Sequence, residues 1–334
     1  MKIGFGLALD FWSKKKTLSK HLDQYSRLIN MAEEYGFNSI WAGEFYSNTS
    51  IPGHTPSPLM ILAALAGRTN LRIGTGVTLI TLWHPLRLAY DGAILDHLSE
   101  GRFTLGVGVG AKSQLRRFGY SGNQAGSRMD EALELLKAFW SGADSYQGKH
   151  FQFDGNVFPS PIQKGGPPIL IGGAIKRSID RSLKFGEGWY GATQYHFEVI
   201  KRQAALYNKE LKLMGVEKEP NITVNRTTFL APTNRIAQKE GMPYVEDVLN
   251  FYARMRALKD IDGNILLPKT NLFEKTGKEI YFLGTPSSCI DEMTCYIDAG
   301  VTQFNFRVGM GDMPIELIER TVKLLGEKVI PHFT

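Results

Sequence analysis

Short apolar runs alternate with longer amphipathic segments along the whole chain of 334 residues. Residues 71–79 and 103–107 are rich in Ile, Val, Leu and Thr, and between them the apolar positions of residues 85–98 recur at helical spacing. This order of strand, helix and strand is typical of parallel α/β proteins, because a crossover between parallel strands needs room for a helix. Over the whole chain, the pattern predicts strands near 2–9, 38–43, 71–79, 103–107, 168–172, 187–191, 221–230 and 302–307. It predicts helices near 18–35, 56–68, 85–98, 125–140, 176–185, 194–213, 286–299 and 313–328.

Eight predicted strands, each followed by a helix, match the α/β fold called the (β/α)₈ or TIM barrel. We therefore expect residues 1–334 to form a single domain. The helix boundaries agree with this interpretation. Gly36 follows the first predicted helix, and Pro286 and Gly300 lie at the start and the end of the seventh.

Two stretches are longer than a minimal barrel requires. Residues 141–167 are expected to form a hairpin and a proline-rich crossing. Residues 231–285 form a long insertion between strand 7 and its helix, with an amphipathic piece near 243–259 and a polar loop to about 280. Loops of this length in a compact domain are usually functional lids or disordered, and this one would overhang the face on which barrel enzymes bind ligands.

Composition and charge narrow the class of protein. No window approaches the roughly 18 apolar residues that span a bilayer, and the N-terminus, with Asp10 in an apolar run, is expected to be the first strand of a cytoplasmic protein. The net charge of +6 is spread along the chain, with one dense run from Lys14 to Lys16. Nucleic-acid binding is not expected, because a basic stripe with interleaved aromatics is absent. A basic surface suits anionic cofactors better.

The two cysteines are not expected to form a disulfide or to bind a metal ion. Cys289 and Cys295 are six positions apart in a predicted helix. At 1.5 Å per residue they lie about 9 Å apart along its axis, too far for an unstrained bond. Neither cysteine lies in a cluster of further Cys or His residues.

Glycines gather toward the carboxyl ends of two predicted strands. Gly74 and Gly76 lie in the third strand, Gly106 lies near the end of the fourth, and Gly108 and Gly110 follow it. A missing side chain there lets the backbone approach a flat cofactor, although tight packing inside a barrel is an alternative reason. The dinucleotide fingerprint G-x-G-x-x-G is not present, because the third glycine of GVGVG comes one place too early.

A second glycine site has the features of an anion site. The run IGGAIKRS ends a predicted strand at Gly172 and Gly173 and opens a helix with Lys176, Arg177 and Ser178 in its first turn. Exposed N–H groups and the helix dipole favour a phosphate there. The alternative is that the basic side chains are simply solvated.

Polar side chains at other strand ends are candidates for chemistry. Glu44 closes the second strand, His84 follows the third, Tyr195 and His196 follow the sixth, and Arg307 closes the eighth. Each has a structural alternative; Glu44 could cap a neighbouring loop, and the histidine before Pro85 could fix a turn. No Ser/His/Asp set, zinc motif or phosphate-binding loop is present, so an imported cofactor would carry the chemistry.

Four runs together identify a family resemblance. These are IGTGVTLITLWHPLRLAYDGAILDHLSEGRFTLGVGVG, RMDEALELLKAFWSG, GKHFQF with PPILIGG, and GVTQFNFRVGMGDMPIELIERTVKLLGEKVIPHF. In this order and spacing they resemble the bacterial luciferase-like monooxygenases over nearly the whole chain. The resemblance implies a (β/α)₈ barrel with an insertion in its later loops. It also implies that reduced FMN, or the deazaflavin coenzyme F(420), binds at the carboxyl face.

The resemblance also assigns residues to the cofactor. It implies a non-proline cis peptide at Gly76–Val77 behind the ring, with Glu44 near the ring and a phosphate toward Arg177 and Ser178. The full cofactor set is Glu44, Gly76, Val77, Val109, Gly110, Lys112, Gly172, Gly173, Ala174, Ile175, Arg177 and Ser178.

Two departures from the light-emitting luciferases limit what the resemblance implies. Those enzymes carry His directly after the acidic residue, whereas Glu44 is followed here by Phe45 and Tyr46, so bioluminescence is not expected. The Arg that they place in the fourth strand's glycine run is Val109 here, which leaves other cations to meet the phosphate.

The expected activity is that of a flavin-dependent monooxygenase acting on a small organic substrate with reduced FMN and O₂. The resemblance implies a flavin reductase that supplies reduced FMN, and a homodimer or larger homo-oligomer. One alternative is F(420)-dependent hydride transfer, which does not activate oxygen, and another is a non-catalytic flavin-binding protein. The substrate would lie among Trp12, Phe45, Tyr46, Trp83 and Tyr195. Proton transfer is assigned to His84, His196 and Glu44, because a pKa near neutrality suits histidine for it.

Overall fold

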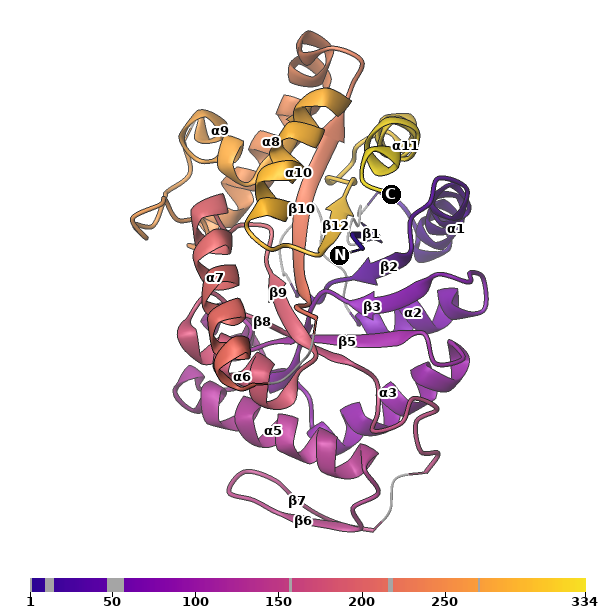
Figure 1. The fold of residues 1–334 in the computed structure, drawn as a ribbon, viewed down its shortest axis with the longest axis vertical. Coiled ribbons are helices and arrows are strands. Elements are labelled where there is room, and N and C mark those ends of the chain that lie inside the picture. Colours follow the sequence, from indigo (N-terminus) through magenta and orange to yellow (C-terminus); the bar gives the residue numbers. More distant parts are fainter. Residues whose placement is uncertain (1, 10–14, 47–56, 156–157, 216–218, 270) are drawn as a thin grey trace.

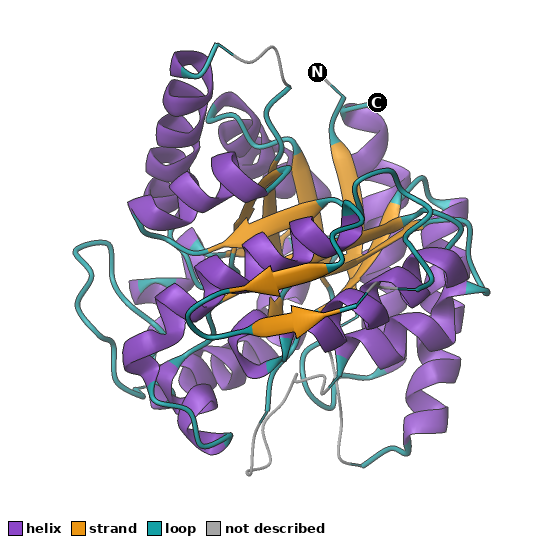
Figure 2. Ribbon diagram, turned by 90° about the horizontal axis from the view of Figure 1, so that it is seen from below, coloured by secondary structure: helices purple, strands orange, loops and turns teal. Residues whose placement is uncertain are grey.

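Eight parallel strands close into a barrel in the computed structural model, which describes residues 2–9, 15–46, 57–155, 158–215, 219–269 and 271–334. The neighbours around the barrel are β10, β12, β1, β2, β3, β5, β8 and β9, and β9 pairs with β10 to close the ring. Helices surround the strands (Figures 1 and 2). The barrel strands are β1 (Gly4–Ala8), β2 (Ser39–Ala42), β3 (Arg72–Thr75), β5 (Phe103–Gly108), β8 (Ile169–Gly172), β9 (Gly188–Gly191), β10 (Ile222–Leu230) and β12 (Gln303–Arg307). The predicted fold class and all eight predicted strands are confirmed.

The eight predicted helices are also present. They are α1 (Leu18–Glu34), α2 (Pro58–Ala66), α3 (Pro85–Leu98), α5 (Ala125–Trp140), α6 (Lys176–Phe185), α7 (Phe197–Leu213), α10 (Pro286–Asp298) and α11 (Ile315–Leu324). After α11 the chain continues as one π-helical turn, η4 (Leu325–Val329). Single 3₁₀ turns are η1 (Ile80–Leu82), η2 (Gly122–Gln124), η3 (Gly277–Glu279) and η5 (Ile330–His332). None of the described helices is long and apolar enough to cross a membrane.

The predicted hairpin between α5 and β8 is confirmed. Strands β6 (Ser145–Gln147) and β7 (Gln152–Asp154) pair antiparallel and project beyond α5 (Figure 1). The carboxylate of Glu131 on α5 accepts the backbone N–H groups of His150, at 2.9 Å, and Phe151, at 2.7 Å. The hairpin is thereby attached to the helix that precedes it.

The insertion between β10 and α10 is more ordered than the sequence indicated. Its first element is α8 (Asn234–Arg254), where the side chain of Thr233 caps the first turn by accepting the Ile236 N–H. The amphipathic piece was predicted near 243–259. The helix instead runs through Pro243 and begins earlier.

Two further elements of the insertion were not predicted. A short helix α9 (Leu272–Lys275) precedes the strand β11 (Tyr281–Gly284). That strand pairs with Thr227–Leu230 at the end of β10, beyond the part of β10 that pairs with β12. The insertion is therefore joined to the barrel by an extra strand at the carboxyl end of β10.

Large side chains from β2 and β9 fill the barrel interior, and glycines on β3 and just after it make room for them. Trp41 and Tyr190 have ring centroids 5.9 Å apart. A Cβ atom on Gly74 would lie 2.4 Å from the Trp41 ring, and one on Gly76 would lie 2.3 Å from the Tyr190 hydroxyl. Packing of protein against protein is thus sufficient to require both glycines, as the alternative interpretation of the sequence stated.

The same packing predicts a large loss of stability for Gly106→Ala. A Cβ atom on Gly106 would lie 2.0 Å from the backbone oxygen of Thr75. A backbone atom cannot move aside as the end of a flexible side chain can. We expect the free energy of unfolding to fall by about 3 kcal/mol, measured by denaturant titration. Gly67→Ala is the matched control, because a Cβ there meets nothing within 4 Å. Equal stability of the two variants would contradict this description of the interior.

Candidate functional site

The carboxyl ends of the barrel strands open into a cavity of about 560 Å³. Small-molecule sites are usually concavities of roughly 300–1,000 Å³ lined mainly by apolar groups. A larger hollow of about 1,090 Å³ lies at the opposite ends of the strands and includes the charged side chains of Lys137, Lys164 and Glu187. Barrel enzymes place their chemistry at the carboxyl face. The smaller cavity is therefore the candidate site.

Twelve of the predicted site residues line this cavity. They are Glu44, Phe45, Gly76, Val77, Val109, Gly110, Gly172, Gly173, Ala174, Ile175, Ser178 and Tyr195. The predicted residues outside the lining are Tyr46, Trp83, His84, Lys112, Arg177 and His196. Trp12 lies outside the residues that the structure describes.

The floor of the cavity is the break between β3 and the short strand β4 (Thr78–Leu79). The peptide bond between Gly76 and Val77 is cis, as the resemblance implied. The Gly76 N–H donates to the carbonyl of Ala42 at 2.9 Å, and the Val77 carbonyl accepts the Glu44 N–H at 3.0 Å. These backbone bonds join the floor to the end of β2.

Glu44 fixes the same segment through its side chain. The carboxylate, only 6% exposed, accepts the Leu79 N–H at 2.6 Å, the Trp83 indole N–H at 3.1 Å and the Tyr46 hydroxyl at 2.5 Å. Tyr46 and Trp83, predicted to contact substrate, instead contact Glu44. The loop-capping alternative for Glu44 therefore describes its contacts, although the residue also lines the cavity.

Burial also changes the acidity of this carboxyl. Desolvation raises the pKa of Glu44 above its ordinary value, while the hydrogen bonds that it accepts act in the opposite direction. The pKa of the Tyr46 hydroxyl is raised by its own burial and by the neighbouring carboxylate. The pair is consequently a place where a proton can be held next to the cavity.

The start of α6 forms the second functional part of the cavity. Its N-cap residue, Ile175, provides no side-chain cap, so the N–H groups of the first turn are not satisfied in that way. Gly173, at φ +141°, lies so close to Ser178 that a Cβ would be 2.1 Å from the hydroxyl oxygen. The carbonyl of Gly173 accepts the indole N–H of Trp189 at 2.7 Å, which holds the turn in place.

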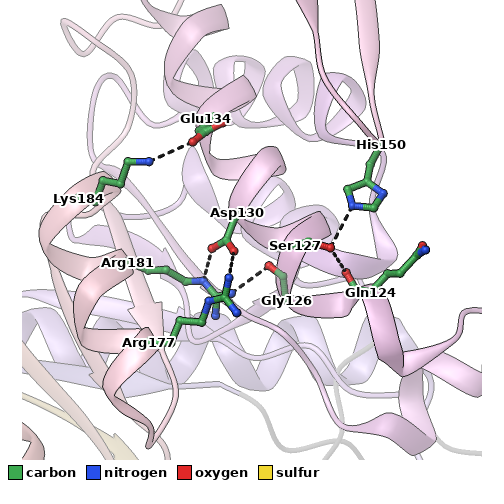
Figure 3. Close-up of polar contacts among 9 residues, drawn as sticks. All are labelled: Gln124, Gly126, Ser127, Asp130, Glu134, His150, Arg177, Arg181 and Lys184. Carbon is green, nitrogen blue, oxygen red and sulfur yellow. Dashed lines mark hydrogen bonds and ion pairs between the residues drawn. The ribbon is translucent and has the colours of Figure 1, made fainter.

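Arg181 is the cation of this part of the cavity, and sequence reasoning missed it. Its side chain is 5% exposed, lines the cavity, and donates to Asp130 at 2.6 Å and to the Gly126 carbonyl at 2.9 Å (Figure 3). Arg177 contacts the other oxygen of Asp130 at 2.9 Å, but its side chain is 63% exposed and outside the lining. Both arginines lie on the face of α6 that meets α5, and the burial that distinguishes them depends on α5.

The insertion supplies an aromatic wall. Phe251 and Tyr252 on α8, with Met255 beyond its end, line the cavity opposite residues of the barrel. The rings of Phe45 and Phe251 meet edge to face at 5.3 Å, and Arg307 donates to the Tyr252 hydroxyl at 2.8 Å. The 231–285 segment therefore covers the site, the position expected of a lid.

The two predicted histidines lie away from the cavity. His84 is an exposed N-cap residue of α3 whose ring lies 5.6 Å from that of Phe151. The buried Nε2 of His196 lies 2.6 Å from the Thr276 hydroxyl and 3.2 Å from the Lys259 carbonyl, both in the insertion. Burial lowers the pKa of His196. The positions of these histidines do not support the predicted proton transfer at the cavity.

The loop after β9 is held by a buried arginine that the sequence did not mark. Arg226 donates to the carbonyls of Ala192, Thr193 and Tyr195, all of which line the cavity. Its Nε donates to the Tyr296 hydroxyl at 2.9 Å. Arginine is almost never fully buried unless it is paired. The sequence does not show which groups Arg226 contacts, so its burial could not be predicted.

Gln114 and Asn225 are further lining residues without a sequence signal. Gln114, on the unpredicted helix α4 (Lys112–Arg117), exchanges two hydrogen bonds with the backbone of Tyr46. Asn225 points inward from β10 and lines the cavity from within the barrel. Among the described residues, no group of three His, Cys, Asp or Glu side chains is placed to hold a metal ion.

The chain is similar to known enzymes of two kinds. The chain is 24% identical to the oxygenase component of a flavin-dependent trigonelline monooxygenase from Acinetobacter baylyi, over 100% of this chain and 96% of that protein. It is 25% identical to an F420-dependent glucose-6-phosphate dehydrogenase from Nocardia farcinica, over 83% of this chain and 85% of that protein. Both a flavin and a deazaflavin enzyme are thus among its relatives.

Comparison with solved structures identifies the same group of proteins. The crystal structure of the monooxygenase RslO1 from Streptomyces bottropensis superposes with a TM-score of 0.87, at 25% identity, over 99% of this chain and 100% of that one. A family model described as luciferase-like monooxygenase matches residues 1–303. With the barrel, the floor at Gly76–Val77 and the match over most of its length, the chain belongs to the luciferase-like monooxygenase family of oxidoreductases.

Proposed function

We propose that the protein is an FMN-dependent monooxygenase that uses reduced FMN and O₂ to oxygenate a small organic substrate. The observation that carries the proposal is the buried cation that lines the cavity next to the start of α6. There Arg181 lines the cavity, is almost fully buried, and is fixed to α5 through Asp130. A buried cation beside uncapped helix N–H groups suits a phosphate at the end of a ligand.

The cavity fits a flat ring joined to a phosphate by a polar chain. Val77 presents an apolar surface at the floor, where it packs against a small buried cluster that contains Leu170 and Tyr190. Between the floor and the start of α6 the lining is Gly172, Gly173 and backbone around them, which can hydrogen-bond a polyhydroxyl chain. The residues present therefore fit FMN in each of its three parts.

The burial of the cation that lines the cavity favours FMN over coenzyme F(420). FMN ends at its phosphate, whereas the deazaflavin carries an acidic lactyl-glutamate tail beyond it. Gly126 and Asp130, both on α5, close around Arg181 and leave it 5% exposed (Figure 3). An enclosed cation suits a terminal phosphate better than a phosphate from which a chain continues into solvent.

F(420)-dependent hydride transfer is the second candidate, and one observation favours it. Lys176 and Arg177 are exposed on the first turn of α6, where they could meet an acidic tail that leaves the cavity. The F420-dependent relative also shows that similar chains use this cofactor.

When bound, reduced FMN supplies the electrons that activate oxygen. The protein's part is to hold the ring against Val77, keep water out and orient the substrate. Phe45, Phe251 and Met255 form the apolar side of the chamber, and Tyr195 lies at its wall. We infer that the substrate occupies this space under the insertion. Its lining is apolar and aromatic, whereas the lining near the start of α6 is polar and includes a cation.

We assign proton transfer to Glu44 rather than to either histidine. It is the member of the predicted trio that lines the cavity, and burial raises its pKa above the ordinary value of a glutamate. The hydroxyl of Tyr46 donates to the ionised carboxylate, and it can accept from the protonated one. Glu44 can therefore take up and release a proton without losing this partner.

A separate flavin reductase would supply the reduced cofactor. The trigonelline relative is named as the oxygenase component of its enzyme. The chain itself lacks the glycine fingerprint of a dinucleotide site, because AKSQ follows GVGVG. Reduced FMN would thus reach the cavity from outside.

Cofactor binding and reoxidation test the proposal. Reduced FMN and reduced F(420) are titrated into the protein without oxygen, and the FMN complex is then mixed with oxygenated buffer. We expect tighter binding of FMN, and reoxidation in more than one kinetic phase. Tighter binding of F(420) would overturn the proposal in favour of hydride transfer. Single-phase reoxidation at the rate of free flavin would indicate a binding protein without catalysis.

Substitution of the two α6 arginines tests the phosphate site. Arg181→Ala should weaken FMN binding by about 10- to 100-fold, because a charge-assisted hydrogen bond contributes about 1.5–3 kcal/mol. Arg177→Ala should change it by less than about threefold, because exposed ion pairs contribute little. Binding is measured by anaerobic titration.

Riboflavin is the matched ligand control because it lacks the phosphate. Arg181→Ala should leave riboflavin affinity unchanged, and Arg181→Lys should restore part of the affinity for FMN. An equal loss for both ligands would mean that Arg181 supports the fold only. A larger effect at Arg177 than at Arg181 would favour an acidic tail outside the cavity.

A further inference from the structure

Tyr190 lies beside the cavity floor and is itself one of the residues that line the cavity. It comes from β9, across the barrel from β3, and its side chain is 2% exposed. It belongs to a small buried cluster, separate from the main core, formed by Ala8, Trp41, Leu170 and Tyr190. The side chain of Val77 packs against this cluster, so the floor rests directly on it.

The hydroxyl group is the part of Tyr190 nearest to the floor. A Cβ on Gly76 would lie 2.3 Å from the hydroxyl oxygen and 2.9 Å from the ring carbon that carries it. The backbone at Gly76 thus lies in contact with this group. Backbone hydrogen bonds with Ala42, the last residue of β2, and with Glu44, just after it, hold the same segment from the other side.

The position of the hydroxyl is fixed by amides from two other strands. Asn305 on β12 donates to it at 3.2 Å, and Asn225 on β10 donates at 3.4 Å. Asn305 in turn accepts from Gln303 at 3.0 Å, and Gln303 also donates to Ser39 on β2. A hydrogen-bonded chain across four strands therefore includes the hydroxyl next to Gly76.

Burial of the Tyr190 hydroxyl costs free energy and requires polar partners inside the barrel, which indicates that the group has a role. A phenylalanine would fill the same volume in an apolar cluster without requiring polar partners inside the barrel. Asn225 also lines the cavity, and its buried Oδ1 has no hydrogen-bond partner among the described residues. The polar chain thus reaches the cavity at two residues of its lining, Asn225 and Tyr190.

We propose that Tyr190 is a positioning residue, whose hydroxyl, held by Asn305 and Asn225, fixes the Gly76–Val77 floor at the height that the cofactor ring requires. The inference rests on the proposed function, because it needs a ring in the cavity. It does not depend on whether that ring is a flavin or a deazaflavin. Because Tyr190 also lines the cavity, its effect on the position of the floor is tested separately through Asn305, which holds the hydroxyl and lies outside the lining.

Tyr190→Phe tests the proposal by ligand binding and by spectroscopy. The variant is titrated with reduced FMN without oxygen, and the absorption spectrum of bound oxidised FMN is compared with that of the unmodified protein. We expect the dissociation constant to rise on the order of fivefold and the bound absorption bands to shift, because a loosened floor changes contact with the ring. Tyr207→Phe is the matched control, because Tyr207 is equally buried but lies on α7 outside the cavity lining.

Asn305→Ala provides a second variant that leaves the tyrosine ring in place. It should shift affinity and spectrum in the same direction, and combining it with Tyr190→Phe should add little, because both act on one hydrogen bond. If Tyr190→Phe does not fold, Asn305→Ala gives the same test alone. Thermal unfolding of the ligand-free proteins is measured in parallel.

The outcomes separate the inference from the proposed function. Lower thermal stability with unchanged affinity and an unchanged spectrum would overturn the inference, because the hydroxyl would then serve folding only. If the unmodified protein binds F(420) rather than FMN, the same variants are titrated with F(420) and the same loss is expected. Binding of neither cofactor by the unmodified protein would overturn the proposed function and this inference together.

Discussion

The barrel has to enclose two large aromatic side chains, Trp41 and Tyr190, and still leave a cavity at one end of its strands. Both rings point inward, and Gly74 and Gly76 on the neighbouring part of the sheet provide the space for them. The filled interior then becomes the support for the Gly76–Val77 floor, which packs on the same cluster. Core packing and ligand site are consequently parts of one arrangement.

The charged groups around the cavity are each fixed by a specific partner. Glu44 is surrounded by donors from the segment that it holds, and Arg181 is held against α5 by Asp130 and Gly126. Arg226 supports the loop after β9 in the same manner. Buried charges are tolerated when they are paired or fully hydrogen-bonded, so these contacts give the cavity defined walls before any ligand enters.

The regular parts of the fold could be predicted from the sequence because their signals are local. The helices over 125–140 and 176–185 were predicted with the boundaries that α5 and α6 have, since amphipathic spacing decides them. The start of α8 was misplaced, because the amphipathic pattern was followed only from about residue 243, whereas the helix begins at Asn234 and continues through Pro243. Strand β11 was missed because its pairing with Thr227–Leu230 is a tertiary contact.

The parts of the site that the backbone forms at the ends of the strands could be predicted from the sequence. The glycine segments at 76 and 172–173 line the cavity, as expected. Arg177 and Arg181 carry the same charge one helical turn apart, and only the packing of α5 makes one buried and the other exposed. Tyr46 and Trp83 were expected at the substrate but contact Glu44, because direction of a side chain is set by the surrounding fold.

A crystal structure of the protein with FMN tests the central claim most directly, namely that the cavity at the carboxyl face holds a flavin between the Gly76–Val77 floor and the start of α6. The account predicts that the ring lies against Val77 and that the phosphate is within hydrogen-bond distance of Ser178 and Arg181. FMN bound in the hollow at the opposite ends of the strands, or with its phosphate away from α6, would contradict it.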